Sequence, residues 1–112
     1  MALLTTQTIT RAALTPTYAA VAASDTLTPG GQVFVHVKNG GASPDTVGIT
    51  VLAGDPPGLT IADLSVSVPN GSERMIGPLP GQFFADPVTG LCTITHSFTT
   101  TVTVAVFNLS QP

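Results

Sequence analysis

The chain has 112 residues, of which only 8% are charged, and its formal net charge at pH 7 is −3. Its three cationic residues are too few and too scattered to neutralise a run of phosphates, which argues against nucleic acid and anionic membranes as partners. A hydrophobic content of 43% without a high net charge argues against disorder and for one folded domain with its own core.

Targeting signals are not evident in the sequence. No stretch approaches the ~20 apolar residues of a membrane-spanning helix, and residues 1–7 lack the basic and apolar regions of a signal peptide. Cys92 is the only cysteine, so it has no partner for an internal disulfide. We therefore expect a protein that is made in a reducing host cytoplasm.

The N-terminal region gives the weakest pattern of the chain. Residues 8–12 have the composition of an edge strand or of an extended arm. Residues 17–22 contain enough alanine for a helix, but Pro16, Thr17 and Val21 favour extended structure. We therefore predict a second strand there.

Two segments with period-two alternation follow. Residues 32–38 place three valines on one face, and residues 46–51 again alternate apolar with small or polar residues. Residues 39–41 (Asn-Gly-Gly) lie between them and have the composition of a tight turn. This order predicts a hairpin or two neighbouring strands.

The middle of the chain contains the clearest turn. After a loop at residues 54–58, residues 64–68 and 73–76 are predicted strands, and the intervening Pro-Asn-Gly-Ser of residues 69–72 is predicted to be a hairpin turn. The proline-rich residues 77–81 exclude a central strand because proline lacks the backbone donor. Phe83 and Phe84 follow this segment. They could form an exposed adhesive spot or fill one end of the core, and we favour the second interpretation, a plug.

The C-terminal third contains two more strong strand patterns. Residues 91–98 alternate so that one face carries Cys92, Ile94, His96 and Phe98. Residues 102–109 do the same with Val102, Val104 and Val106, and residues 99–101 join the two.

Together these elements predict an all-β fold without a convincing helix. Seven or eight short antiparallel strands indicate an Ig-like or jelly-roll-type β-sandwich. We expect residues 1–15 to form an N-terminal arm or edge strand and residues 16–112 to form the single sandwich domain.

Catalytic and glycosylation motifs give no functional site. The chain has no Gly-x-Ser-x-Gly elbow and no phosphate-binding glycine loop. Two tripeptides that begin at Asn70 and Asn108 match the N-glycosylation pattern. We interpret both as incidental because no secretory signal accompanies them.

The cysteine and the two histidines do not predict a metal site. Cys92 and His96 share a strand face, but four residues along a strand span about 13 Å, whereas a zinc ligand lies within ~2.3 Å of the metal. His36 could approach one of them, but no third ligand is evident. We therefore expect no metal and no cofactor, and Cys92 lacks the basic neighbours that would activate a nucleophile.

The aspartates are interpreted as turn and strand-entry residues. They are scattered along the chain beside Pro, Gly, Ser or Thr, where a carboxylate accepts hydrogen bonds from nearby backbone amides. A calcium site would need several of them in one loop. These residues are Asp25, Asp45, Asp55, Asp63 and Asp86.

The order of these features resembles a family of small capsid and head-decoration proteins of tailed bacteriophages, especially those of actinobacteria. The resemblance covers roughly residues 28–110 and rests on structural elements rather than on chemical motifs. The similar segments are residues 35–41, 47–51, 66–79 and 102–109, together with Phe83 and Asp86. It implies a β-sandwich that binds the outside of an icosahedral shell as a monomer or a trimer and reinforces contacts between subunits of the major capsid protein. The family has no active-site residues to carry over.

We therefore expect a non-enzymatic virion protein located on the capsid exterior, with the major capsid protein as partner and residues 1–15 as an arm towards a neighbour. Two alternatives stay open. One is a tail or fibre component of the same kind of particle. The other is a cell-surface or carbohydrate-binding Ig-like module, for which the lack of Trp and the single Tyr18 leave few aromatic platforms.

Overall fold

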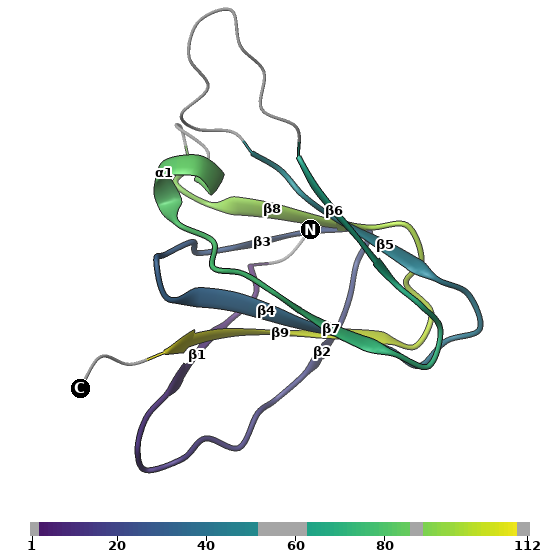
Figure 1. Cartoon of the computed structure of the whole chain (residues 1–112), viewed down its shortest axis with the longest axis horizontal. Coiled ribbons are helices and arrows are strands. Elements are labelled where there is room, and N and C mark those ends of the chain that lie inside the picture. The colour runs from purple at the N-terminus through teal and green to yellow at the C-terminus, as the bar shows by residue number, and fades with distance from the viewer. Residues whose placement is uncertain (1–2, 52–62, 86–88, 110–112) are drawn as a thin grey trace, which may run out of the picture.

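The computed structural model describes residues 3–51, 63–85 and 89–109, which form two β-sheets and a single helical turn. Figure 1 shows the two sheets as layers with the core between them, a two-layer, sandwich-like arrangement. The first sheet has the order β1-β9-β4-β7, with β2 also paired to β9: β1 (Thr6–Ile9), β2 (Ala19–Ala20), β4 (Val33–Asn39), β7 (Glu73–Ile76) and β9 (Val102–Leu109). The second sheet has the order β3-β8-β5-β6: β3 (Ser24–Leu27), β5 (Asp45–Ile49), β6 (Leu64–Val68) and β8 (Cys92–His96).

The strands pair in a nested pattern. β5 pairs with β6, β4 with β7, β3 with β8 and β2 with β9, and all four pairs are antiparallel. Along the chain from β2 to β9, every connection except β5–β6 therefore passes from one sheet to the other. The strands are thus arranged as one long hairpin that is folded over on itself.

The core consists of the inward-facing residues that the alternation predicted. Val33, Val35 and Val37 of β4 face Ile49 and Ile94 of the second sheet, and all are nearly inaccessible to water. Complete burial of one such side chain stabilises the fold by about 1.5–3 kcal/mol. These rows of alternating residues are therefore the main reason why the sheets stack.

The predicted hairpin between β4 and β5 is wrong, since these strands lie in different sheets. The amide of Asn39 explains the crossover: its Nδ2 donates to the carbonyl oxygens of Ser43 at 2.8 Å and of Val68 at 3.0 Å. Its Oδ1 accepts a bond from the Gly41 nitrogen at 3.0 Å. This buried side chain ties the end of β4 to the end of β6 across the two layers.

The turn at residues 69–72 is confirmed, but the prediction that it is a hairpin turn is wrong. Gly71 has a φ of +77°, and the Ser72 nitrogen donates to the Pro69 oxygen at 3.0 Å. The turn nevertheless leads from β6 in the second sheet to β7 in the first. Residues 99–101 make a similar crossing from β8 to β9.

Near the N-terminus the structure differs from the expected strands. The strand predicted at residues 17–22 reduces to Ala19–Ala20, and β3 was not predicted because its Ser-Asp-Thr-Leu sequence has only one apolar residue. β1 is an edge strand that pairs in parallel with β9, so the expectation of purely antiparallel strands fails there. Before β1, the Leu4 nitrogen donates to the Thr26 oxygen at 2.8 Å, so residues 3–9 contact both sheets.

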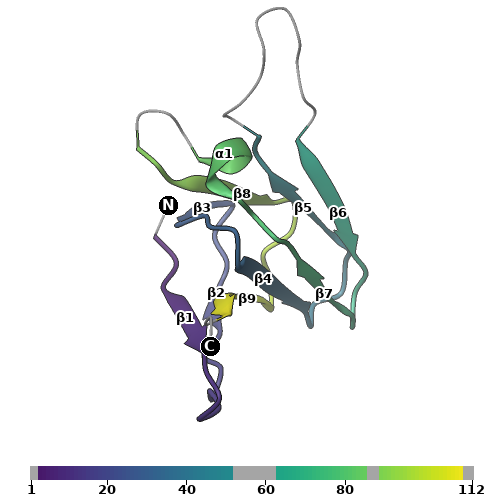
Figure 2. The same cartoon turned by 60° about the vertical axis from the view of Figure 1, so that its left-hand side comes forward.

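Residues 10–18, which we call the tongue, connect β1 to β2 and extend beyond the sandwich (Figure 2). The amide of Gln7 closes its base: Nε2 donates to the Thr17 oxygen at 2.7 Å, and Oε1 accepts from the Thr17 nitrogen at 2.8 Å. The side chain thereby imitates a pair of ladder bonds and holds the tongue against β1.

One helical turn, α1 (Gly81–Phe84), was not predicted. Its two internal bonds are Phe84 nitrogen to Pro80 oxygen at 3.2 Å and Ala85 nitrogen to Gly81 oxygen at 3.1 Å. Phe84 is buried in the core, which confirms the plug interpretation for this residue. The Phe83 side chain and the predicted loop at residues 54–58 lie outside the described part of the chain.

Candidate protein-binding surface

The outer faces of the two sheets differ in chemistry. The outward positions of the second sheet carry almost only hydroxyl side chains, and the strand register brings them together as neighbours: Ser24 with Thr95, Thr26 with Thr93, and Thr46 with Ser67. No described residue at these positions is charged or large and apolar. This polar face is therefore suited to remain in contact with water.

The outer face of the first sheet carries an apolar area. Phe34 of β4 lies opposite Phe107 of β9, with ring centroids 5.5 Å apart. Met75 of β7 is 66% exposed and Leu109 of β9 is 50% exposed. Other residues of the chain therefore cover these two apolar side chains only in part. Ile9 of β1 extends the apolar area across the sheet because it pairs with Leu109.

Two hollows run along this face and share the side chains of Phe34 and Met75. One has a volume of about 470 Å³ and lies between the ends of β4, β7 and β9, where Pro78 and Leu109 help to line it. The other has a volume of about 250 Å³ and lies between the sheet and the tongue, where it is lined by Ile9, Leu14, Pro16, Tyr18, Phe34, His36, Met75 and Phe107. We refer to the two hollows together as the groove.

A polar cluster borders the groove. The hydroxyl of Tyr18 lies 2.7 Å from Nδ1 of His36, whose Nε2 lies 3.2 Å from Oε1 of Glu73. Tyr18 also meets Phe107 edge-on, with ring centroids 6.2 Å apart, and Nζ of Lys38 lies 4.2 Å from the Tyr18 centroid. These contacts fix the Tyr18 ring, which comes from the end of the tongue, over the sheet.

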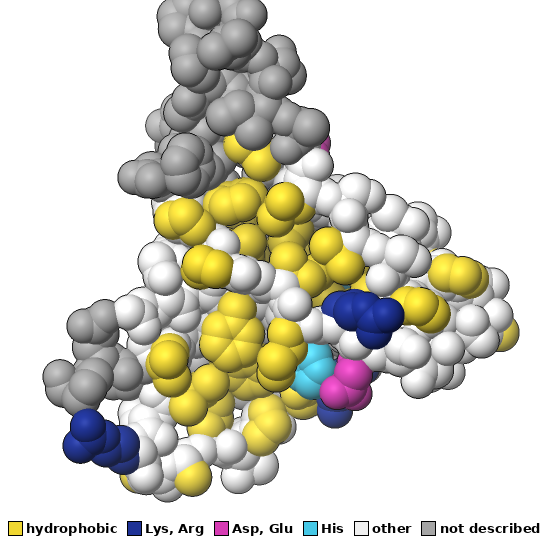
Figure 3. Space-filling model, in the orientation of Figure 1, with side chains coloured by type: hydrophobic (Ala, Val, Ile, Leu, Met, Phe, Trp, Pro, Cys, Tyr) yellow, Lys and Arg dark blue, Asp and Glu magenta, His cyan; other side chains and the backbone are white. Residues whose placement is uncertain are grey.

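Figure 3 shows apolar side chains in a band that runs from the upper centre to the lower part of this view, with a histidine and an acidic side chain next to each other at the right-hand border of its lower part. Lys or Arg side chains lie beside this pair and at the lower left. The chain has three cations, Arg11, Lys38 and Arg74, and each is within two residues of a residue that lines the groove. Among the described residues, none of the three forms an ion pair with a carboxylate.

A third hollow, of about 480 Å³, lies on the opposite side of the tongue base. It is lined by residues 3–5, by β2 and by residues 104–106, where the edge of β9 passes from β2 to β1. Its lining includes the buried Asp25, whose carboxylate accepts a bond from the Ala22 nitrogen at 3.1 Å.

His96 and Asp45 form a separate buried pair inside the sandwich. His96 Nδ1 and Asp45 Oδ2 are 2.7 Å apart, and both side chains are fully buried. Asp45 Oδ1 also accepts bonds from the backbone nitrogens of Ser97 at 3.0 Å and Phe98 at 3.2 Å. None of the three hollows described above is lined by this pair, so it serves to join β5 to the end of β8.

The residues considered for a metal site are not brought together. Cys92 and His96 face the interior from the second sheet, whereas His36 lies on the outer side of the first sheet. Within the described ranges, no group of three or more metal-ligating side chains is present.

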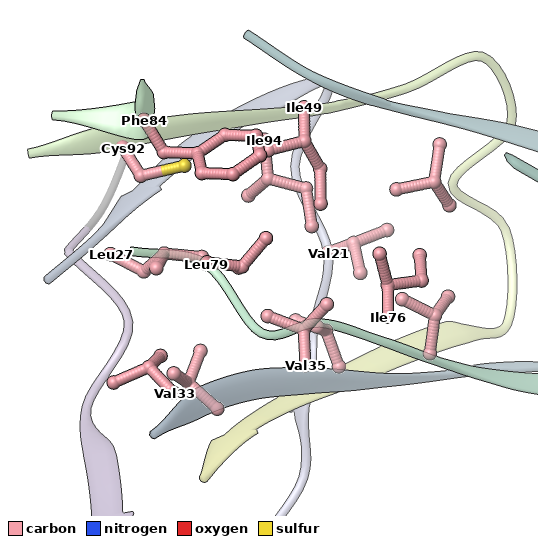
Figure 4. Close-up of a cluster of buried hydrophobic side chains, with 14 of the residues drawn as sticks. Val21, Leu27, Val33, Val35, Ile49, Ile76, Leu79, Phe84, Cys92 and Ile94 are labelled. Carbon is pink, nitrogen blue, oxygen red and sulfur yellow. The ribbon is translucent and has the colours of Figure 1, made fainter. Parts of the chain in front are cut away.

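Cys92 is a packing residue. Figure 4 shows its side chain pointing into the core beside the Phe84 ring, with Leu27 nearby. Burial raises the pKa of the Cys92 thiol from 9.0 to about 11. The thiol is therefore protonated at neutral pH and is a poor nucleophile.

The prediction that the aspartates bond nearby backbone amides is confirmed at Asp25, which accepts from the Ala22 nitrogen three residues away. It is wrong for Asp45 and Asp63, which accept from amides distant in the sequence: Ser97 and Phe98 for Asp45, and Val51, at 2.9 Å, for Asp63 Oδ1. Asp55 and Asp86 lie outside the described residues.

Sequence reasoning did not identify the groove, although one signal for it was present. Phe34, His36 and Lys38 alternate with the three core valines of β4, so they had to share the other face of that strand. Their contact with Tyr18 and Met75 depends on strands that are distant in the sequence, and no local pattern predicts it.

Comparison with known proteins finds no family model that matches the chain, no similar curated protein and no similar solved structure. Within the described residues, no helix is long and apolar enough to cross a membrane.

Proposed function

We propose that the protein is a non-enzymatic structural protein of a virus particle, a decoration protein that binds the exterior of a tailed-phage head. The main support is the nested pairing of β2–β9, β3–β8, β4–β7 and β5–β6. A long hairpin folded into two sheets in this way has the connectivity of a jelly roll rather than of an Ig-like sandwich. Jelly rolls form the domains of many viral capsid proteins, so the argument is one of fold analogy.

The contrast between the two outer faces supports the same proposal. A decoration protein has one surface against the shell and another in water. The apolar groove, with cations nearby that form no ion pair among the described residues, is suited to the first role, and the hydroxyl face of the second sheet is suited to the second. Contiguous exposed apolar surface rimmed by polar groups is typical of protein-binding sites.

The partner in this proposal is the major capsid protein, and the protein occupies the virion surface as a monomer or as a trimer. Because β1 pairs with β9 of its own chain, we propose that the tongue, rather than an arm of residues 1–15, makes the contact with a neighbour.

The decisive experiment is mass spectrometry and cryo-electron microscopy of particles from a phage that encodes the chain. We expect the protein on the outside of the head, with a copy number set by the local symmetry axes of the shell. Absence from virions would reject the proposal, whereas rings or fibres at the tail would assign it to the tail instead.

A carbohydrate-binding module is the second candidate, because lectins also use the jelly roll. The aromatic residues of the groove are mostly engaged with each other, with Phe34 against Phe107 and Tyr18 against both His36 and Phe107. Specific binding on a glycan array, combined with absence from particles, would favour this candidate.

A further inference from the structure

The groove is an apolar feature of the described surface that the fold itself leaves open. Its two hollows share Phe34 and Met75, so an extended chain can fill both without a break. Met75 belongs to β7, which is an edge strand of the first sheet and leaves space beside it. The shape is therefore suited to a segment of polypeptide rather than to a single small molecule.

The charges around the groove indicate which polypeptide would fit. Arg11 follows β1 closely, and Lys38 continues the outward row of β4, where its Nζ lies 4.2 Å from the centroid of the Tyr18 ring. Arg74 pairs with the core residue Val37, so it starts from the inner face of β7, opposite to Met75. None of the three cations has a carboxylate partner among the described residues, and Arg74 Nη1 donates only to the Glu73 carbonyl at 2.8 Å. The one acidic side chain at the border, Glu73, is already held by His36.

A second copy of the chain is a poor candidate for the polypeptide that fills the groove. Two copies facing each other through the groove would bring Arg11 and Lys38 of one copy towards those of the other, and like charges at an interface cost affinity. The described residues include only two exposed carboxylates, Asp63 and Glu73, so another surface of a second copy offers little compensation. Nucleic acid also fits poorly, since three cations contact few phosphates.

We propose that the groove binds an extended segment of another protein in which large apolar side chains are flanked by carboxylates. The apolar side chains enter the two hollows, and the carboxylates meet Arg11 and Lys38. This inference deepens the proposed function by giving the chemistry of the bound segment, and it rests on that function only for the identity of the protein that carries the segment.

The first test uses synthetic peptides and amide chemical shifts of the isotopically labelled protein. The probe is Asp-Glu-Phe-Leu-Asp-Glu with blocked ends, and the matched controls are Lys-Lys-Phe-Leu-Lys-Lys and Asp-Glu-Ser-Ser-Asp-Glu. We expect the probe to shift the amides of Phe34, Met75 and Phe107, to bind at least about tenfold more tightly than either control, and to weaken as salt screens the charges. Equal binding of the basic peptide, shifts on the second sheet or no shift at millimolar peptide would overturn the inference.

The second test uses variants of the whole protein and purified shells in a co-sedimentation assay. Met75→Glu is compared with Leu64→Glu, which places the same charge on an exposed apolar residue of edge strand β6. Arg11→Gln with Lys38→Gln is compared with Ser67→Glu with Thr95→Glu, because both pairs lower the net charge by the same amount and the second pair lies on the hydroxyl face. We expect the groove variants to lose shell binding by about tenfold or more and the controls to keep it.

The two tests separate the two proposals. If the wild-type protein does not bind shells but the acidic peptide occupies the groove, the proposed function fails and this inference stands. If the wild-type protein binds shells and the groove variants bind equally well, the inference fails and the proposed function stands. Circular dichroism melting of each variant identifies any loss of binding that comes from unfolding.

Discussion

At the scale of single residues, the buried polar groups are sensitive to the loss of a hydrogen-bond partner. The Asp45 carboxylate is hydrogen-bonded to the imidazole of His96 and accepts hydrogen bonds from two backbone nitrogens. The Asn39 side chain donates a hydrogen bond across the two layers. His96 Nε2 is buried and has no hydrogen-bond partner among the described residues. Such groups are costly when a partner is removed, because the remaining donors have no access to water.

Replacement of Asp45 tests this directly. We expect Asp45→Ala to lower the free energy of unfolding by about 2–4 kcal/mol, since it leaves one buried imidazole and two partly buried amides without their partner. Urea denaturation measures the change. The matched variant is Asp63→Ala, which removes one bond to the Val51 nitrogen at an exposed position and should cost about 1 kcal/mol. Equal losses in the two variants would contradict this interpretation of the Asp45 network.

The buried thiol of Cys92 should make the protein less stable at alkaline pH. Its thiol ionises near 9.0 when unfolded and, because of burial, near a pKa of about 11 when folded. The contribution is complete below pH 9 and decreases as the pH rises towards 11, because only the unfolded state releases the proton there. At about 1.4 kcal/mol per unit, the free energy of unfolding should fall by up to about 3 kcal/mol.

The pH dependence is measured as the difference between the wild type and Cys92→Ala in urea denaturation series, which cancels the titration of every group that the two proteins share. A difference that stays constant from pH 8 to pH 11 would show that the thiol is accessible to water, in conflict with its complete burial.

At the scale of elements, the connections between the sheets decide how the strands combine. The β4–β5 and β8–β9 connections lie against each other: the Gly40 nitrogen donates to the Thr101 oxygen at 3.0 Å. Gly41 has no room for a side chain, because a Cβ would overlap the Phe98 ring and the carbonyl oxygen of Thr100. Close backbone approach, rather than a positive φ, therefore requires glycine at position 41.

A pair of glycine substitutions tests the packing of these connections. We expect Gly41→Ala to destabilise the protein by about 1–3 kcal/mol through overpacking. Gly31→Ala, at a site with nothing within 4 Å of the added Cβ, should change stability by less than about 1 kcal/mol. Thermal unfolding compares the two variants, and similar melting temperatures would indicate that the crossing connections are loosely packed.

At the scale of the whole molecule, the nested pairs make most contacts non-local. Only β5 and β6 are neighbours both in the chain and in a sheet, and each further pair encloses all the previous ones. Loop-closure entropy must be overcome before the outer pairs form, so folds of this kind fold slowly.

This topology predicts the folding rate. We expect refolding after dilution from urea to take milliseconds to seconds, as for other β-proteins dominated by distant contacts. Stopped-flow fluorescence of Tyr18, which packs against β4 and β9, follows the process. Complete refolding in microseconds would contradict the nested pairing.

The sequence alone identified most strands but not their partners. Alternation located β4, β5, β6, β7, β8 and β9 because one side of each strand must be apolar to line the core. A turn such as residues 69–72 has the same composition whether it closes a hairpin or crosses between sheets, so pairing could not be read locally. β3 escaped detection because a short edge strand needs only Leu27 and the buried Asp25 on its inner side.

The hydroxyl face of the second sheet has a consequence for any surface that the protein covers. Ser and Thr side chains in register, such as Ser24 with Thr95, hold water firmly but carry no charge at any accessible pH. A layer of these molecules, each attached through its first sheet, would therefore give the underlying particle an outer skin whose hydration is independent of acidity and ionic strength. Particles coated in this way would repel one another through bound water, and their colloidal behaviour would no longer follow the charge of the surface beneath.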